Sequence, residues 1–305
     1  MRLIVLGAAA GGGLPQWNCA ATNSASFWVG DSHHRAIAPA ATQSSLAVSA
    51  DGASWLVLNA SPDIRAQIMA TPALQPRRDD GLRNSPIAAV LLTNGDIDHV
   101  AGLLTLREGT GFDLWATGEI HAVLDQNPIF EAVNRDVVPR RAIALDQPVE
   151  VLAGLTATLF AVPGKVPLYL EGESVDTALM GEQTVGVELA TEERRAFYIP
   201  GCARMIPALA DRLRGAQLVL FDGTVFHDDE MIRAGVGPKT GQRMGHMAMA
   251  GPDGSLAAFE GLDVTRRVYV HINNTNPVWA VGSAERAQVE AAGWTVAHDG
   301  LEIAL

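Results

Sequence analysis

Nine short apolar runs of five to eight residues recur along the chain and constrain its fold more than any other feature. Runs of this length, rich in branched and aromatic side chains and bounded by turn residues, are typical of buried β-strands. They predict strands at 3–7, 44–50, 55–60, 87–93, 155–162, 184–190, 196–200, 217–222 and 267–272. We therefore expect a core that is built mainly from β-sheets.

Helical segments lie between clusters of these strands and do not alternate strictly with single strands. Helices are predicted at 61–70, 99–108, 118–126, 204–214 and 283–292. The first of them would open with Ser61 as its N-cap and Pro62 in its first turn. This order favours an αββα sandwich, in which two mixed sheets pack face to face under outer helices, over a doubly wound parallel sheet. We expect one domain over residues 1–305, with an exposed connection at 71–86.

The composition fits a large globular core and excludes several classes of partner. Of the 305 residues, 48% are hydrophobic and 18% are charged. The net charge of −12, without clustered Lys and Arg, argues against nucleic acid. No apolar run reaches the roughly 20 residues that span a bilayer. A secretory signal is an alternative interpretation of the apolar start, but that start lacks a clear cleavage pattern, so the sequence predicts a cytoplasmic protein.

The strongest chemical signal lies just after the apolar run 87–93. Asp98 and His99 occupy the loop that leads into the next predicted helix, and His271 directly follows the apolar residues VYV. A carboxylate and two imidazoles carried by strand ends can bind a divalent transition metal and leave positions open for a substrate or for oxygen. The alternative is that Asp98 serves only as a helix N-cap and His99 only as a first-turn residue.

Other polar residues also follow predicted strands. Asp222 ends the run 217–222 and is a candidate metal ligand or general base. His246 is either a proton donor, since imidazole titrates near neutral pH, or a core histidine bonded to a backbone carbonyl. Three asparagines either anchor a tight turn or orient a ligand and bound water. They are Asn273, Asn274 and Asn276.

The glycine-rich segment GAAAGGGLPQW at 7–17 is a weak candidate for a phosphate-binding loop. It lacks the lysine of a P-loop and does not run into a clear helix, so we do not expect nucleotide binding. We expect its glycines to form a tight turn or to let the backbone pass close to the site.

Seven segments together resemble the family of proteins B of pyrroloquinoline quinone (PQQ) biosynthesis. They are GGGLPQWNC (11–19), TQSSLAVS (42–49), NASPDIRAQI (59–68), IDHVAGLLTLREG (97–109), DDEM (228–231), GQRMGH (241–246) and HINNTNP (271–277). The resemblance covers almost the whole chain and implies the metallo-β-lactamase fold, which agrees with the sandwich predicted from the strands. It also implies a step in making PQQ from a glutamate and a tyrosine of a precursor peptide, namely iron-dependent hydroxylation of the tyrosine ring.

The wider metallo-β-lactamase superfamily carries a His-x-His-x-Asp-His loop whose last two positions correspond to Asp98 and His99. Asn94 and Asp96 replace its first two histidines, which should weaken one of the two metal positions of a hydrolase. Asp98, His99 and His271 keep the other position, and this ligand set suits a mononuclear Fe(II) oxygenase. The same ligands would hold Zn²⁺, so a metal-dependent hydrolase is the rival interpretation. A third is a carrier that transports PQQ or an intermediate without chemistry.

The chain departs from the family at a cluster of cysteines. The family commonly has Cys-x-Cys-x-x-Cys after the PQWN segment, where the cysteines hold a structural zinc. This chain has Cys19 but then Ala21 and Ser24, so a structural zinc is doubtful and Cys19 is expected to be a small buried hydrophobe. His33 and His34 are alternative ligands, although a solvated loop is the expected place for this pair.

Cys202 is the second of only two cysteines in a chain this long, so we do not expect a disulfide framework to hold the fold together. It lies where the superfamily often presents a bridging aspartate. We expect a buried, inert thiol, with an approach to the metal as the alternative.

The sequence thus predicts an Fe(II)-dependent hydroxylase, with Zn(II) as the alternative metal. Asp222 and His246 would manage protons or orient the metal ligands, while Asn94, Asp96 and the asparagines after His271 would shape the pocket. A small peptide or amino-acid-derived substrate and O₂ would be its reactants, and other PQQ biosynthesis proteins its partners. Two arginines are candidates for pairing with a substrate carboxylate: Arg65 and Arg243.

Overall fold

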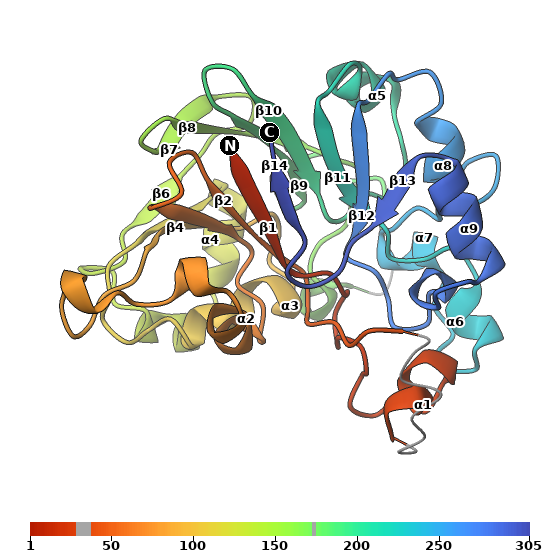
Figure 1. Cartoon of the computed structure of the whole chain (residues 1–305), viewed down its shortest axis with the longest axis horizontal. Coiled ribbons are helices and arrows are strands. Elements are labelled where there is room, and N and C mark those ends of the chain that lie inside the picture. Colours follow the sequence, from red (N-terminus) through yellow and green to blue (C-terminus); the bar gives the residue numbers. More distant parts are fainter. Residues whose placement is uncertain (29–37, 173–174) are drawn as a thin grey trace.

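Two seven-stranded mixed β-sheets lie face to face, with helices outside them (Figure 1). The computed structural model describes residues 1–28, 38–172 and 175–305. The first sheet has the order β14 (Glu302–Ala304), β1 (Arg2–Gly7), β2 (Ser45–Ser49), β3 (Trp55–Leu58), β4 (Ile87–Leu91), β5 (Asp113–Ala116) and β6 (Arg140–Ala142). The second has the order β13 (Trp294–Val296), β12 (Arg266–Val270), β11 (Leu218–Asp222), β10 (Arg195–Ile199), β9 (Val185–Ala190), β8 (Leu155–Ala161) and β7 (Pro148–Leu152). The predicted αββα sandwich is confirmed.

All nine predicted strands are present, and their ends differ from the prediction by no more than two residues. Five further strands were not predicted: β5, β6, β7, β13 and β14. Four of these are the outermost strands of the two sheets, and β5 lies next to the edge strand β6. An edge strand needs less apolar surface than a central one, so these short strands carry polar and charged residues and give a weaker sequence signal.

The helices are α1 (Thr22–Trp28), α2 (Ile64–Ala70), α3 (Ile97–Val100), α4 (Gly118–Asp125), α5 (Pro207–Leu213), α6 (Glu230–Arg233), α7 (Gly241–Met244), α8 (Ser255–Ala258) and α9 (Ala284–Ala291). The predictions for α4 and α9 are correct to within one residue at each end, and α5 begins three residues later than predicted, at a proline. Four helices were not predicted, because at four to seven residues they are too short to show a helical period: α1, α6, α7 and α8.

The predicted start of α2 at Ser61 was wrong. The helix begins at Ile64 after Asp63, and the buried Ser61 hydroxyl instead donates to Gln67 Oε1 at 3.1 Å. The connection at 71–86 is mostly exposed, as predicted, and contains two single turns of 3₁₀ helix, Pro72–Leu74 and Arg78–Asp80.

The helix predicted at 99–108 was also wrong in its extent. Helix α3 starts two residues earlier, at Ile97, and gives way at Ala101 to a 3₁₀ turn. The cause is Gly102, whose backbone N–H donates to Ala60 O at 2.9 Å and so leaves the helical hydrogen-bond ladder. A Cβ atom at Gly102 would lie 2.1 Å from Ser61 O, so only glycine permits this close packing.

Strands β3 to β6 are parallel, as are β10 to β13, so the carboxyl ends of several strands lie at one end of the sandwich. A contiguous cluster of buried apolar side chains from both sheets supports this arrangement. Within the described ranges, no helix is long and apolar enough to cross a bilayer.

Candidate metal centre

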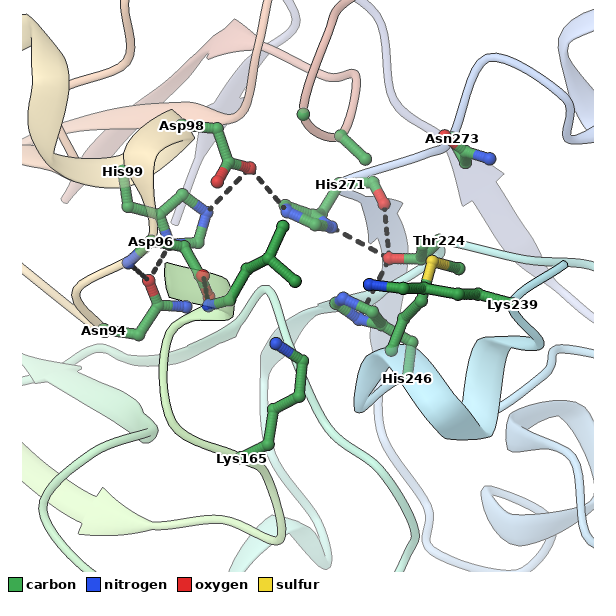
Figure 2. A pocket seen from close by; sticks show the side chains of 14 residues that line it. Asn94, Asp96, Asp98, His99, Lys165, Thr224, Lys239, His246, His271 and Asn273 are labelled. Carbon is green, nitrogen blue, oxygen red and sulfur yellow. Dashed lines mark hydrogen bonds and ion pairs between the residues drawn. The ribbon is translucent and has the colours of Figure 1, made fainter. Parts of the chain in front are cut away.

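A cavity of about 240 Å³ lies where segments from both sheets meet (Figure 2). Residues after β4 line one side, and residues after β11 and β12 line the other. Its polar lining includes seven residues predicted for the site: Asn94, Asp96, Asp98, His99, His246, His271 and Asn273. The fold thus brings together side chains that are up to 179 positions apart in the sequence.

Asp98, His99 and His271 form a compact group at the inner end of this cavity. Asp98 and His99 lie on α3, and His271 follows β12. Asp98 Oδ2 lies 3.3 Å from His271 Nε2 and 3.8 Å from His99 Nε2. One ligand atom from each residue lies within 4.8 Å of the other two, so a single ion can bind all three.

The hydrogen bonds of His99 leave one ring nitrogen available to a metal. Its Nδ1 lies 2.8 Å from Asn94 Oδ1, and the Asp96 backbone N–H also donates to that oxygen at 3.0 Å. Because Oδ1 only accepts, His99 Nδ1 carries the proton and Nε2 presents its lone pair. That Nε2 is buried and has no hydrogen-bond partner among the described residues, which is the arrangement that a metal ion would satisfy.

Thr224 gives His271 the same orientation from the other sheet. The Thr224 hydroxyl donates to Asp222 Oδ1 at 2.7 Å, so it accepts from His271 Nδ1 at 2.8 Å. His271 Nε2 is then the nitrogen that faces Asp98. The backbone of His271 is left-handed, with a φ of 55°, which a non-glycine residue adopts only under tertiary constraint. Thr224 was not among the predicted site residues, although its position two residues after Asp222 could have indicated it.

Burial and the neighbouring charges shift the pKa values of all three candidate ligands. Burial lowers the pKa of His99 to about 4, so this ring is neutral. Burial alone would raise the pKa of Asp98, but His99 and His271 hold it well below its usual range. At His271 burial lowers the pKa, and the Asp98 carboxylate more than offsets this and raises it. Because the raised pKa favours the protonated ring, a divalent cation would compete with a proton at His271.

Asp222 and His246 form a hydrogen-bonded pair beside this group. The fully buried Asp222 carboxylate accepts from His246 Nδ1 at 2.7 Å, from the Cys202 N–H at 2.9 Å and from Thr224. His246 stacks on His271, with ring centroids 5.1 Å apart. Asp222, His246 and His271 also lie close enough to share an ion, but donors already occupy both Asp222 oxygens. The pair is thus better suited to hold and move protons than to bind a metal.

The other predicted polar residues divide between the cavity and its support. Asp96 lines the cavity and accepts from the Leu168 N–H at 3.2 Å, and burial, with Asp98 nearby, raises its pKa. Asn273 also lines the cavity. Asn276 instead caps a 3₁₀ turn and donates to Gly223 O, while Asn274 faces Ser24. The tight-turn alternative therefore describes Asn276, whereas the Asn274 side chain contacts a distant segment.

Neither cysteine contributes to the cavity lining. Burial raises the pKa of the Cys202 thiol, which donates to Arg204 O at 3.2 Å, so the alternative of a metal-directed thiolate has no support. Cys19 is buried, and its sulfur accepts from the Ala21 N–H. Among the described residues, no group with metal-binding geometry includes Cys19, and His33 and His34 lie outside those residues.

The cationic residues of the cavity differ from those predicted. Arg65 is exposed on α2, and Arg243 pairs with Glu171 at 3.1 Å; neither lines the cavity. Lys165 and Lys239 line it instead, from segments that no predicted motif included. Their scarcity could have indicated them, because they are the only two lysines of the chain.

The glycine-rich start behaves as expected from its composition. Gly12 and Gly13 have φ values of 96° and 70°, which form a tight turn. Ala10 and Gly11 line the cavity, and a Cβ atom at Gly11 would lie 3.4 Å from Asp98 Oδ2. The backbone therefore passes directly beside the candidate ligand.

The chain is similar to known proteins over its full length. Residues 54–272 match the β-lactamase superfamily domain. The chain is 59% identical to coenzyme PQQ synthesis protein B of Ruegeria pomeroyi and 56% identical to that of Methylorubrum extorquens, in both cases over the full length of both chains. The crystal structure of Zn²⁺-bound PqqB from Methylobacterium extorquens superposes with a TM-score of 0.96 at 56% identity, again over all of both chains.

A more distant likeness supports the fold alone. A diphosphatase from the PhnP family matches all of this chain and 97% of its own, with a TM-score of 0.65 at 21% identity. The family model and the PqqB superposition identify the architecture as the metallo-β-lactamase fold. From its full-length identity to these relatives, the chain belongs to the coenzyme PQQ synthesis protein B family.

Proposed function

We propose that this protein is an Fe(II)-dependent hydroxylase that acts on the tyrosine ring of a Glu-Tyr-derived precursor of PQQ. One observation carries the proposal: Asp98, His99 and His271 converge, while the loop that supplies two more histidines in related hydrolases offers Asn94 and Asp96. Two imidazoles and one carboxylate suit Fe(II) and leave positions open for O₂ and substrate.

When bound, Fe(II) would supply the redox chemistry that activates O₂. In the overall reaction, one oxygen atom enters a ring C–H bond to give a new hydroxyl group. The other oxygen atom leaves as water, with two protons and two electrons from an external two-electron reductant. These requirements make O₂, a reductant and a small tyrosine-containing peptide the reactants of the proposed enzyme.

The protein's own residues would bind and orient the reactants and move protons. Asn94 and Thr224 hold the two ligand rings through their Nδ1 atoms. His246 keeps its Nδ1 proton on Asp222, so its Nε2 is available to take a proton from a phenol in the cavity. The buried Asp222 carboxylate would stabilise the imidazolium that forms. We place this chemistry in the cytoplasm with the other PQQ biosynthesis proteins.

A metal-dependent hydrolase is the second candidate. The family relative of known structure is described as Zn²⁺-bound, and a more distant structure of the same fold is described as a diphosphatase. The same three ligands would hold Zn²⁺, which would supply an activated water, and His246 would donate a proton to the leaving group.

The test is to load metal-free protein anaerobically with Fe(II) or Zn(II) and then add O₂, a reductant and a glutamate-tyrosine dipeptide. We expect mass spectrometry to detect oxygen added to the tyrosine with iron only. His271→Ala should abolish this reaction, whereas the exposed control His298→Ala should retain it. No added oxygen with saturating iron would contradict the proposal and favour the hydrolase, or a carrier of PQQ or an intermediate.

A further inference from the structure

The two lysines of this chain occupy one place in the fold. Lys and Arg together number 22, yet only Lys165 and Lys239 are lysine. Both line the cavity that holds the candidate metal ligands, although they lie on segments far apart in the sequence. Figure 2 shows both side chains extending into the cavity, with their amino groups turned toward its interior. The other 20 of these cationic residues are arginines, and none of the arginines in the described part of the chain lines the cavity.

The ion pairs around the lysines leave positive charge in the cavity. Lys165 Nζ lies 2.9 Å from Glu171 Oε1, but Arg243 binds the other oxygen of that carboxylate at 3.1 Å. One carboxylate therefore serves two cations. Lys239 forms no ion pair with any carboxylate in the described part of the chain.

The acidic residues of the cavity do not reverse this balance. Among the described residues, Asp96 and Asp98 are the carboxylates that line it. Asp98 belongs to the proposed ligand group, and a divalent cation bound there would carry more charge than Asp98 neutralises. With such a cation bound, the lining would carry a net positive charge in a chain whose net charge is −12. Such a contrast selects an anionic ligand.

We infer that Lys239, with Lys165 beside it, recognises a carboxylate of the substrate. This inference rests on the proposed function and names the chemical group that the substrate must carry. An ammonium group is a compact charge on a flexible stem, so it can reach a single carboxylate oxygen from the wall of a small cavity. The planar guanidinium of the predicted arginines needs more space for its bidentate contact.

The experiment measures binding separately from chemistry. The Zn²⁺-loaded protein is titrated by calorimetry with the glutamate-tyrosine dipeptide and with its analogue in which both carboxylates are amides. We expect the wild type to prefer the dipeptide by about tenfold or more, as for the loss of a charge-assisted hydrogen bond. Lys239→Met should remove most of that preference without changing the affinity for the amide, and Lys239→Arg should restore part of it.

Arg233→Met is the matched control, because it removes one positive charge from α6 outside the cavity. It should keep the preference of the wild type. Equal binding of both peptides by the wild type, no binding of the dipeptide, or equal weakening of both by Lys239→Met would overturn the inference. A preserved preference without oxygen transfer by the iron-loaded protein would instead contradict the hydroxylase and leave carboxylate recognition intact.

Discussion

The first sheet contributes a side of the cavity that differs in kind from the side contributed by the second sheet. After β4, one short loop and one helical turn carry Asp98 and His99, and the buried His99 Nε2 has no partner among the described residues. After β11 and β12, His246 and His271 stack above Asp222, whose two oxygens are both occupied by donors. The first side therefore has a ring nitrogen available to a metal, whereas the polar groups of the second side hydrogen-bond to one another and are held in position.

The two sides share one arrangement of hydrogen bonds, which orients a candidate metal ligand on each side. Asn94 accepts from His99 Nδ1, and Thr224 accepts from His271 Nδ1, both at 2.8 Å. Each sheet therefore orients one imidazole so that its Nε2 faces Asp98. We therefore expect effects of different size when a candidate ligand, a supporting residue or one of these hydrogen bonds is removed.

The largest effect should come from removing a ligand of the first side. We expect His99→Ala to weaken metal binding by more than about a hundredfold and to abolish oxygen transfer, because ligand loss exceeds the effect of losing a supporting contact. His246→Ala should retain metal affinity within about tenfold. Calorimetric titration with Zn²⁺ measures both. Equal losses in the two variants would remove the distinction between the two sides.

The next largest effect should be on stability, from the second side. Asp222→Ala leaves several buried donors without an acceptor, so we expect the free energy of unfolding to fall by about 3 to 5 kcal/mol. Urea denaturation of the metal-free protein measures this loss. The exposed control Asp211→Ala should change it by less than about 0.5 kcal/mol. A small loss in Asp222→Ala would show that this carboxylate does not organise the second side.

Loss of the shared hydrogen-bond arrangement should have a smaller effect on metal binding, of similar size on both sides. Asn94→Ala and Thr224→Val each remove the acceptor of one ligand ring, and we expect each to weaken metal binding by about 10- to 100-fold. Competition with a chromophoric chelator resolves such a change. If only one of the two variants weakens binding, the symmetry of the two supports is wrong.

The smallest effect concerns a buried carboxyl group behind the second side. Glu230 accepts from the Thr275 hydroxyl and the Phe226 N–H, both at 2.7 Å, and thereby ties together the loops after β12 and β11. Burial raises its pKa from 4.5 to about 7 and outweighs these hydrogen bonds. The folded state thus binds the proton more tightly than the unfolded state, and Glu230 lowers stability as the pH rises from about 4.5 toward 7.

Glu230→Gln tests this linkage, since its amide can donate to Thr275 while its oxygen accepts from Phe226. We expect the wild type to lose about 1 kcal/mol more than the variant between roughly pH 6 and pH 8. Unfolding of the metal-free proteins in urea at several pH values provides the measurement. Parallel pH profiles for the two proteins would contradict the raised pKa.

Much of the fold was predictable because its central strands are buried on both faces. Such strands are nearly continuous apolar runs, as in VLL at 90–92 and LVLF at 218–221. The edge strands were missed because contacts with neighbouring elements, and not apolar residues of their own, stabilise them. Helix α3 was misplaced for a related reason, since the bond from Gly102 to Ala60 that ends its regular ladder is a tertiary contact.

The central strands, the sandwich and the candidate ligands Asp98, His99 and His271 could be predicted from local sequence, because each ligand directly follows an apolar run or lies in a recognisable loop. How these residues are used depends on the folded chain. It set the ring orientations of the two histidines through Asn94 and Thr224, filled the oxygens of Asp222, and brought Lys165 and Lys239 into the same cavity. Ring orientation, the hydrogen bonds of a carboxylate and the charge of a cavity cannot be predicted locally, because they depend on atoms that are close in space but distant along the chain.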